Sequence, residues 1–163
     1  MVDLWSRISA TPSGQYGVVS LEQLLSVRFT RRMVDIAVAN GRLLPLHRGV
    51  FAVGHMPRDP RARRRAATLA INTGAWVSNR SCAVHYRVLR KRPGPIHVTV
   101  PGGGGRKQRS GIVVHRARLA EDERTVFEDV PCTTMSRTLL DLSAERPGEL
   151  ETAIKTAGDR ELL

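Results

Sequence analysis

Cysteine is nearly absent from this sequence of 163 residues, in which Cys82 and Cys132 are the only two. Two thiols are too few for the disulfide framework of a small secreted domain, and such usage is typical of a reducing cytoplasm. No apolar run approaches the roughly 18 residues that a membrane helix needs, and the first residues do not resemble a secretory signal. We therefore expect a cytoplasmic protein with no membrane partner.

Acidic residues are almost missing from the middle of the chain. Residues 58–118 contain 15 basic residues and one acid, whereas residues 119–163 contain five basic residues and 11 acids. The whole chain has a net charge of +11, and such an excess attracts polyanions, of which DNA is the commonest in a cytoplasm. Two arrangements are open. The basic middle docks on DNA while the acidic end stays away, or the acidic end folds back to form internal ion pairs.

The spacing of polar and apolar residues predicts two short helices near the start of the chain. Ser20, followed three residues later by Gln23, forms a capping-box pattern, so a helix should begin there. Thr30 is a good N-cap for a second helix over residues 31–39, whose apolar residues share one stripe and which should end at Gly41. Two short helices joined by a tight turn are typical of a helix-turn-helix.

A β-hairpin is predicted directly after the second helix. Residues 43–47 and 50–53 have the composition of two strands that turn at Gly49. A hairpin in this position is the wing of a winged helix-turn-helix. Residues 54–60 have loop composition and two prolines, which predicts a boundary there. Residues 1–57 are therefore expected to form a winged helix-turn-helix DNA-binding domain.

Arginine dominates the residues predicted to contact DNA, since it bonds guanine bidentately or clamps a phosphate. The predicted groove contacts are Arg28, Thr30, Arg31 and Arg32. The predicted wing contacts are Arg42, His47 and Arg48. A basic run in the next helix adds non-specific phosphate contacts at Arg61, Arg64 and Arg65. The alternative is a solvated basic face on a small helical module that binds protein.

The second half of the chain, residues 58–163, alternates between helical and extended patterns. Helices are predicted over residues 61–72, 81–89, 136–144 and 147–158. Residues 95–100 and 111–116 are predicted to pair as antiparallel strands across a glycine-rich loop, with a further short strand near Val130. This half is therefore expected to be a small mixed α/β domain with an antiparallel sheet, which makes the whole chain α+β.

Few motifs indicate chemistry. Cys82 and His85 lie one helical turn apart, but no second closely spaced pair accompanies them, and structural zinc sites usually show two. The glycines at 102–105 join strand to strand and do not match a phosphate-binding loop. Neither a nucleophile elbow nor a strand-borne acid-x-Lys pair occurs. We expect no enzymatic activity, no metal site and no cofactor.

Four strings in order resemble one known family. They are HRGVFAVGH at 47–55, PGPIHVTVP at 93–101, GIVVHR at 111–116, and TT at 133–134 with RTLLDL at 137–142. Together they are similar to the AbiEi-type antitoxins of type IV toxin–antitoxin systems, over residues 17–163. In this family the turn between the two helices often has glycine where Arg28 stands here.

The resemblance implies an N-terminal winged helix that represses its own operon at promoter inverted repeats. It also implies a C-terminal domain that counters a nucleotidyltransferase-like toxin without binding it stably. Many relatives continue into a nuclease-like domain, and this chain stops about where that domain begins. It is therefore expected to be a short member or a truncated product.

The function predicted from the sequence is that of a DNA-binding transcriptional regulator of the antitoxin type. Its predicted partners are double-stranded promoter DNA and a cognate nucleotidyltransferase toxin. Two alternatives stay open: a protein-interaction module whose 58–163 half meets a toxin or another enzyme, and a truncated relative of a nuclease-fused family that has no catalytic activity.

Overall fold

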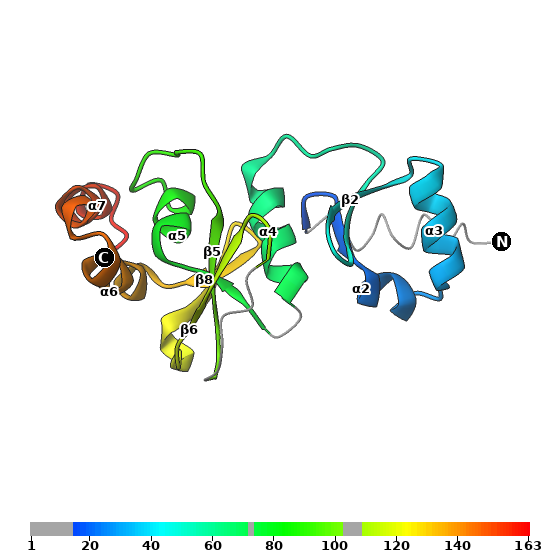
Figure 1. Ribbon diagram of the computed structural model, residues 1–163. Coiled ribbons are helices and arrows are strands. Elements are labelled where there is room, and N and C mark those ends of the chain that lie inside the picture. Colours follow the sequence, from blue (N-terminus) through cyan, green and yellow to red (C-terminus); the bar gives the residue numbers. More distant parts are fainter. Residues whose placement is uncertain (1–14, 72–73, 103–108) are drawn as a thin grey trace. The chain divides into compact units, whose positions relative to one another are not determined.

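The computed structural model describes residues 15–71, 74–102 and 109–163, and its chain divides into two compact units (Figure 1). Unit 1 is Met1–Asn72 and unit 2 is Thr73–Leu163. The division follows residue 72 rather than residue 57, the predicted boundary. The reason is that helix α4 (Pro60–Ile71) packs against all three strands of unit 1 and so belongs to it.

A three-stranded antiparallel sheet organises unit 1. Strand β1 (Val18–Ser20) pairs with β3 (Val50–Val53), which pairs in turn with β2 (Leu43–His47). Helices α2 (Leu21–Ser26) and α3 (Arg31–Ala39) connect β1 to β2. The predicted helix over 31–39 and the strands over 43–47 and 50–53 are confirmed with these bounds.

The core of unit 1 lies between the sheet and the helix pair. Leu24 of α2, Val34 of α3 and Leu43 of β2 are buried in one cluster with Phe29 from the turn. Removing this apolar surface from water stabilises the packing of both helices on the sheet. Leu25, next to Leu24 in α2, points away from this cluster and is 37% exposed.

A five-stranded mixed sheet organises unit 2, in the order β6-β5-β4-β8-β7. The strands are β4 (Trp76–Val77), β5 (Ile96–Val100), β6 (Ile112–Arg116), β7 (Arg124–Phe127) and β8 (Val130–Thr133). A 3-10 turn, η2 (Glu121–Glu123), precedes β7. Strand β7 pairs antiparallel with β8 across a tight turn at Glu128-Asp129, and the sequence patterns did not predict β7.

The predicted antiparallel pairing of the strands around the glycine-rich loop is wrong. Strands β5 and β6 run parallel, with Ile96 opposite Ile112 and Val100 opposite Arg116. The connection therefore returns to the end of the sheet where β5 began. Alternation of polar and apolar residues fixes which face of a strand is buried, but it does not encode the direction of the neighbouring strand. The sheet is mixed because β4 pairs antiparallel with β5 and parallel with β8.

Three helices complete unit 2: α5 (Asn79–His85), α6 (Met135–Glu145) and α7 (Pro147–Asp159). Helix α6 packs against both α5 and α7. Helix α5 ends four residues before the predicted Leu89, because Arg87 takes a left-handed conformation with φ of +63° and closes the helix. Among the described residues, no helix has the length and apolar character needed to cross a bilayer.

Candidate nucleic-acid interface

The turn between α2 and α3 is closed by a helix-terminating motif. The Arg28 N–H donates to the Leu25 carbonyl and the Phe29 N–H to the Leu24 carbonyl, each at 3.1 Å. Arg28 has φ of +73°, the left-handed conformation that this Schellman motif requires. The apolar contact that usually accompanies the motif comes from Leu24 and Phe29, which share one core cluster. The angle between the two helices is thereby set by local hydrogen bonds and burial together.

Helix α3 begins and ends where the sequence predicts. The Thr30 hydroxyl oxygen accepts the Met33 N–H at 3.2 Å, which caps one of the free donors of the first turn. At the other end, Gly41 has φ of +67° and the Arg42 N–H donates to the Ala37 carbonyl at 2.8 Å. These contacts fix both ends of α3, so its first turn directly follows the turn that connects it to α2.

The two faces of α3 differ sharply. Val34 and Ala37 are buried, while the opposite face is exposed at Arg31, Arg32, Asp35, Ile36 and Ala39. Ile36 has half of its surface in water, at 51% exposure, which is unusual for a large aliphatic side chain in the middle of a short helix. Sequence reasoning missed Ile36, although its position one turn after Arg32 placed it on the same face.

The predicted groove and wing residues are accessible. Arg28, Thr30, Arg31, Arg32, Arg42 and Arg48 are exposed, and His47 is half-buried. Arg48 lies at the tip of the β2–β3 hairpin, beside Gly49 with φ of +75°. The Leu21 N–H donates to the Gly49 carbonyl at 2.8 Å, so the hairpin tip lies against the start of α2.

Four of these arginines have no carboxylate partner within the described parts of the chain: Arg28, Arg31, Arg32 and Arg48. Exposed, unpaired guanidinium groups keep their donors available to a phosphate or a base edge. Of the predicted interface residues, these four therefore offer the most accessible positive charge.

The basic run in α4 does not form one exposed surface. Arg61 is ion-paired with Asp59 at 2.7 Å, and its guanidinium lies over the Tyr16 ring. Arg64 is buried at 7% exposure, and burial lowers the pKa of Arg65. The prediction of a phosphate-binding surface at Arg61, Arg64 and Arg65 is therefore not supported, because a helix of alternating Arg and Ala on a sheet must turn some arginines inward.

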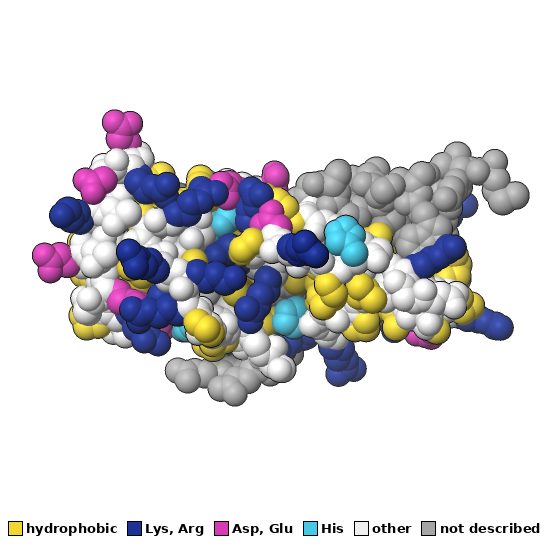
Figure 2. Space-filling view, turned by 90° about the horizontal axis from the view of Figure 1, so that it is seen from above, with side chains coloured by type: hydrophobic (Ala, Val, Ile, Leu, Met, Phe, Trp, Pro, Cys, Tyr) yellow, Lys and Arg dark blue, Asp and Glu magenta, His cyan; other side chains and the backbone are white. Residues whose placement is uncertain are grey.

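In unit 2 the acidic end of the chain folds back on the basic middle. Arg80 pairs with Glu149 at 3.0 Å, Arg87 with Glu128 at 2.5 Å, and Arg92 also reaches Glu149 at 3.4 Å. Figure 2 shows basic and acidic side chains interspersed on the surface of unit 2. Of the two charge arrangements left open by the sequence, internal pairing is the one found in this unit.

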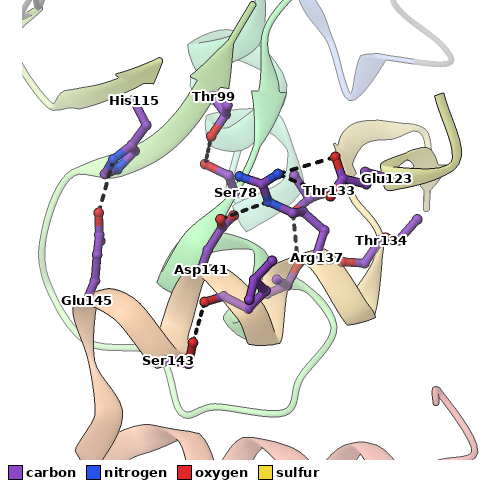
Figure 3. Close-up of polar contacts among 12 residues, drawn as sticks. Ser78, Thr99, His115, Glu123, Thr133, Thr134, Arg137, Asp141, Ser143 and Glu145 are labelled. Atoms are coloured by element: carbon purple, nitrogen blue, oxygen red, sulfur yellow. Dashed lines mark hydrogen bonds and ion pairs between the residues drawn. The ribbon is translucent and has the colours of Figure 1, made fainter. Parts of the chain in front are cut away.

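Arg137 is the centre of a second polar network, from the last of the four resembling strings (Figure 3). Its guanidinium donates to Asp141 Oδ1 at 2.9 Å and to Glu123 at 3.2 Å. Behind it, the hydroxyls of Thr133 and Thr138 share a hydrogen bond of 2.8 Å. Burial raises the pKa of Asp141 even though Arg137 opposes the shift. This network joins β8 and η2 to α6 and so has a structural role.

His97 and His115 lie on neighbouring strands and contact each other. Nδ1 of His97 is 2.9 Å from Nε2 of His115, and Nδ1 of His115 is 3.2 Å from the Glu145 carboxylate. Figure 3 shows the second contact, from β6 to the last turn of α6. Burial, together with His115, lowers the pKa of His97, so its neutral form is favoured. The metal-ligand spacing of the sequence drew attention to Cys82 and His85 and missed this group, because its members are close only in the folded chain.

Cys82 and Cys132 are packed in the core with Tyr86. The Cys82 thiol donates to the Thr133 carbonyl at 3.4 Å, and the Tyr86 hydroxyl donates to the same oxygen at 3.1 Å. Burial raises the pKa of Cys82 well above its ordinary value. His85 contacts the Phe127 carbonyl at 2.9 Å rather than the thiols, so the Cys82-x-x-His85 string does not converge on a common point.

Comparisons with known proteins bear on the fold. No family model and no curated protein matches the chain. Among solved structures, the RV2827C protein from Mycobacterium tuberculosis is similar, with a TM-score of 0.56 and 18% sequence identity. The likeness covers 90% of this chain and 61% of that one, so this chain spans about three fifths of its length. At this level of identity the likeness supports a shared fold alone.

Proposed function

We propose that unit 1 is a winged helix-turn-helix that binds double-stranded DNA, with α3 in the major groove and the β2–β3 hairpin as the wing. The observation that supports this most directly is the exposed face of α3. Its first turn presents Arg31 and Arg32, neither of which has a carboxylate partner in the described residues. Contacts with base edges usually come from the first turns of a recognition helix.

The side chains of α3 suggest a division of roles. Arg31 and Arg32 suit bidentate bonds to guanine O6 and N7, and Ile36 suits apolar contact with a thymine methyl group. Arg28 before the helix and Arg48 at the hairpin tip suit phosphate contacts, which set the register of the protein on the duplex without reading sequence. The proposal thus adds Ile36 to the predicted interface and leaves out Arg64 and Arg65.

The charge of the two units supports the same assignment. Unit 1 contains 11 basic and four acidic residues, a net charge of +7, whereas unit 2 contains 15 basic and 11 acidic residues, a net charge of +4. The shorter unit therefore has the larger excess of positive charge. A concentrated excess of this kind strengthens attraction to the phosphate backbone.

The wider role that we propose is a transcriptional regulator of the antitoxin type, which represses its own operon at inverted repeats and counters a nucleotidyltransferase-like toxin. This part rests on the four strings that resemble AbiEi-type antitoxins. Two-fold symmetric operators require a pair of recognition helices, so the proposal includes two copies of the chain on one operator.

Arg31→Ala/Arg32→Ala tests the groove contacts. With each bidentate contact contributing about 1–3 kcal/mol, affinity for the protein's own upstream DNA should fall by a factor on the order of 100 or more, as measured by fluorescence anisotropy. The circular dichroism spectrum should be unchanged, because both side chains are exposed.

The matched control is Arg90→Ala/Lys91→Ala, which removes two exposed positive charges from unit 2. Its affinity should stay within a few-fold of the wild type. Equal weakening by the two double variants would contradict the groove assignment and indicate non-specific electrostatic binding. In that case the affinity would also fall steeply with added salt for any DNA sequence.

The antitoxin role requires a nucleotidyltransferase gene beside this one, and it is tested separately in cells that express that enzyme. The full-length Arg31→Ala/Arg32→Ala variant should restore growth as well as the wild type does, since unit 2 is unchanged. Loss of both repression and rescue in this variant would contradict the assignment of the two activities to different units.

A further inference from the structure

A group of possible metal ligands in unit 2 has no part in the proposed DNA binding. One ring nitrogen from each of His97 and His115 and one carboxylate oxygen of Glu145 lie within 4.8 Å of one another. Imidazole with carboxylate is a ligand set that suits divalent transition ions, Zn²⁺ above all. All three residues are within unit 2, so the group does not depend on how the two units are placed.

The parallel pairing of β5 and β6 creates this group. In the register, Thr99 lies opposite His115, and His97 is two residues before Thr99 on the same face of β5. The opposite face of both strands is buried and apolar at Val98, Val100, Ile112 and Val114. The two imidazoles therefore project from one face, toward the side where Glu145 reaches β6 from the end of α6.

The two rings bring one nitrogen each to a common point between the strands. Their planes differ by 17° and their centroids are 5.1 Å apart, while the facing nitrogens are 2.9 Å apart. The two nitrogens therefore face each other almost in line, and without an ion one proton bridges them. Two nitrogens bound to one tetrahedral zinc are about 3.3 Å apart, from Zn–N bonds of about 2.0–2.1 Å. Replacing the proton by an ion therefore needs an opening of about 0.4 Å together with a turn of each ring by about 35°, because a tetrahedral ion lies off the line between the two nitrogens.

A second carboxylate is poised nearby. Asp141 precedes Glu145 by one helical turn, on the same face of α6. Its Oδ2 is buried and accepts no hydrogen bond from any described residue, and its charge acts on His115. Asp141 is itself paired with Arg137, and Arg80 with Glu149. Among the described residues, Glu145 and Arg146 are the remaining charges near the two histidines, and they offset each other.

The geometry points to a site for one divalent transition-metal ion of the Zn²⁺ class, with Nδ1 of His97 and Nε2 of His115 as ligands. The Glu145 carboxylate, which contacts Nδ1 of His115 in the ion-free site, turns toward the ion as the third ligand. The remaining position is open to water, as in three-ligand sites. The bound ion ties the edge strand β6 to the end of α6. It is a property of unit 2 that is independent of DNA binding by unit 1.

The test is a titration of tag-free, full-length apoprotein with Zn²⁺ in competition with a chromophoric chelator, repeated with Co²⁺ to report the ligands by visible absorption. We expect one ion per chain and the spectrum of tetrahedral nitrogen–oxygen coordination. Zn²⁺ should also raise the midpoint of thermal unfolding of the wild type. Absence of stoichiometric binding by the wild type, or a thiolate-to-cobalt band from the cysteines, would overturn the proposal.

Three variants locate the site. His115→Ala and Glu145→Gln should lower the affinity by factors on the order of 100 and 10 respectively, and in each variant Zn²⁺ should raise the unfolding midpoint, relative to that measured in chelator, by less than it does in the wild type. His55→Ala, which removes an exposed histidine of unit 1, should bind as the wild type does. Undiminished binding by His115→Ala, or loss of binding in His55→Ala, would place the ion elsewhere and overturn the assignment.

Discussion

The arginines of the two units have different surroundings. In unit 1, Arg28, Arg31, Arg32 and Arg48 are exposed and have no carboxylate partner among the described residues. In unit 2, Arg80 and Arg137 are mostly buried and each is bonded to an acid from a distant part of the chain or from the next helical turn. An arginine that is already paired stabilises the fold, whereas an unpaired one on a rigid helix is available to a ligand. Among these six arginines, the two of unit 2 have a structural role, whereas the four of unit 1 are available for the proposed contacts with DNA.

Arg137→Ala should have the largest effect on stability. It leaves the Asp141 carboxylate buried and unpaired, which costs about 3 kcal/mol, because the two side chains are only 15% and 12% exposed. Hydrogen exchange of the α6 amides measures the loss. Arg31→Ala/Arg32→Ala is the contrasting variant and should change the exchange of α3 by less than about 0.5 kcal/mol. Similar losses in both variants would remove the distinction between paired and unpaired arginines.

Ile36→Ser should have an intermediate effect, on sequence preference rather than on folding. If the aliphatic side chain contacts a thymine methyl group, the variant should lose about 1 kcal/mol of discrimination between thymine and uracil at one operator position. Binding to operators with single thymine-to-uracil replacements measures this. Leu140→Ser is the control, since Leu140 is also exposed, at 61%, but lies in unit 2. A thymine preference that survives in Ile36→Ser would exclude this contact.

Arg28→Gly in unit 1 and Arg87→Gly in unit 2 test the same backbone conformation, at an arginine without a carboxylate partner among the described residues and at an ion-paired one. The backbone of both arginines is in the left-handed region, with φ of +73° and +63°. This conformation costs about 1 kcal/mol in a non-glycine residue, and glycine removes that cost. Part of the gain is lost because glycine has more conformational freedom in the unfolded chain. Arg28→Gly should therefore stabilise unit 1 by about 0.5 kcal/mol.

Arg87→Gly also loses the ion pair with Glu128, which contributes about 0.5 kcal/mol at this exposure. Its net effect should be close to zero. Hydrogen exchange of the α2 and α5 amides separates the two cases, and Arg28→Gly should in addition weaken DNA binding by a similar factor on every sequence. Destabilisation by Arg28→Gly would show that the arginine side chain has a structural role there.

Asp59→Asn should have the smallest effect and tests the ion pair between Asp59 and Arg61 at the start of α4. The hydrogen bond from Arg61 lowers the pKa of Asp59 below its ordinary value of 3.8. A lowered pKa in the folded state means that the stabilisation is complete above 3.8 and is lost as the pH falls through the folded value. The free energy of unfolding of the wild type should exceed that of Asp59→Asn by less than about 1 kcal/mol at pH 7, and the two values should become equal in acid. If the stability difference between the two proteins grew as the pH fell, the lowered pKa of Asp59 would be contradicted.

Local structure followed from the sequence to within a residue or two in unit 1. The capping box of Ser20 and Gln23, the cap at Thr30 and the left-handed stop at Gly41 are interactions among residues three to five apart, and each appears with the expected hydrogen bonds. Such contacts depend on the identity of a few neighbouring residues and on the two backbone dihedrals of each. For this reason they can be read before any tertiary contact is known.

The tertiary structure decided what the residue spacing leaves undetermined. The direction of β6, the domain to which α4 belongs, the arginines of α4 that turn inward, and the meeting of His97, His115 and Glu145 all depend on elements far apart in the chain. A periodic pattern specifies one face of one element, but pairing between elements is selected by the total buried surface and satisfied hydrogen bonds of the whole unit. Whether an arginine is paired, as Arg137 is, or exposed without a carboxylate partner among the described residues, as Arg31 is, depends on which acidic side chains the tertiary structure brings near it.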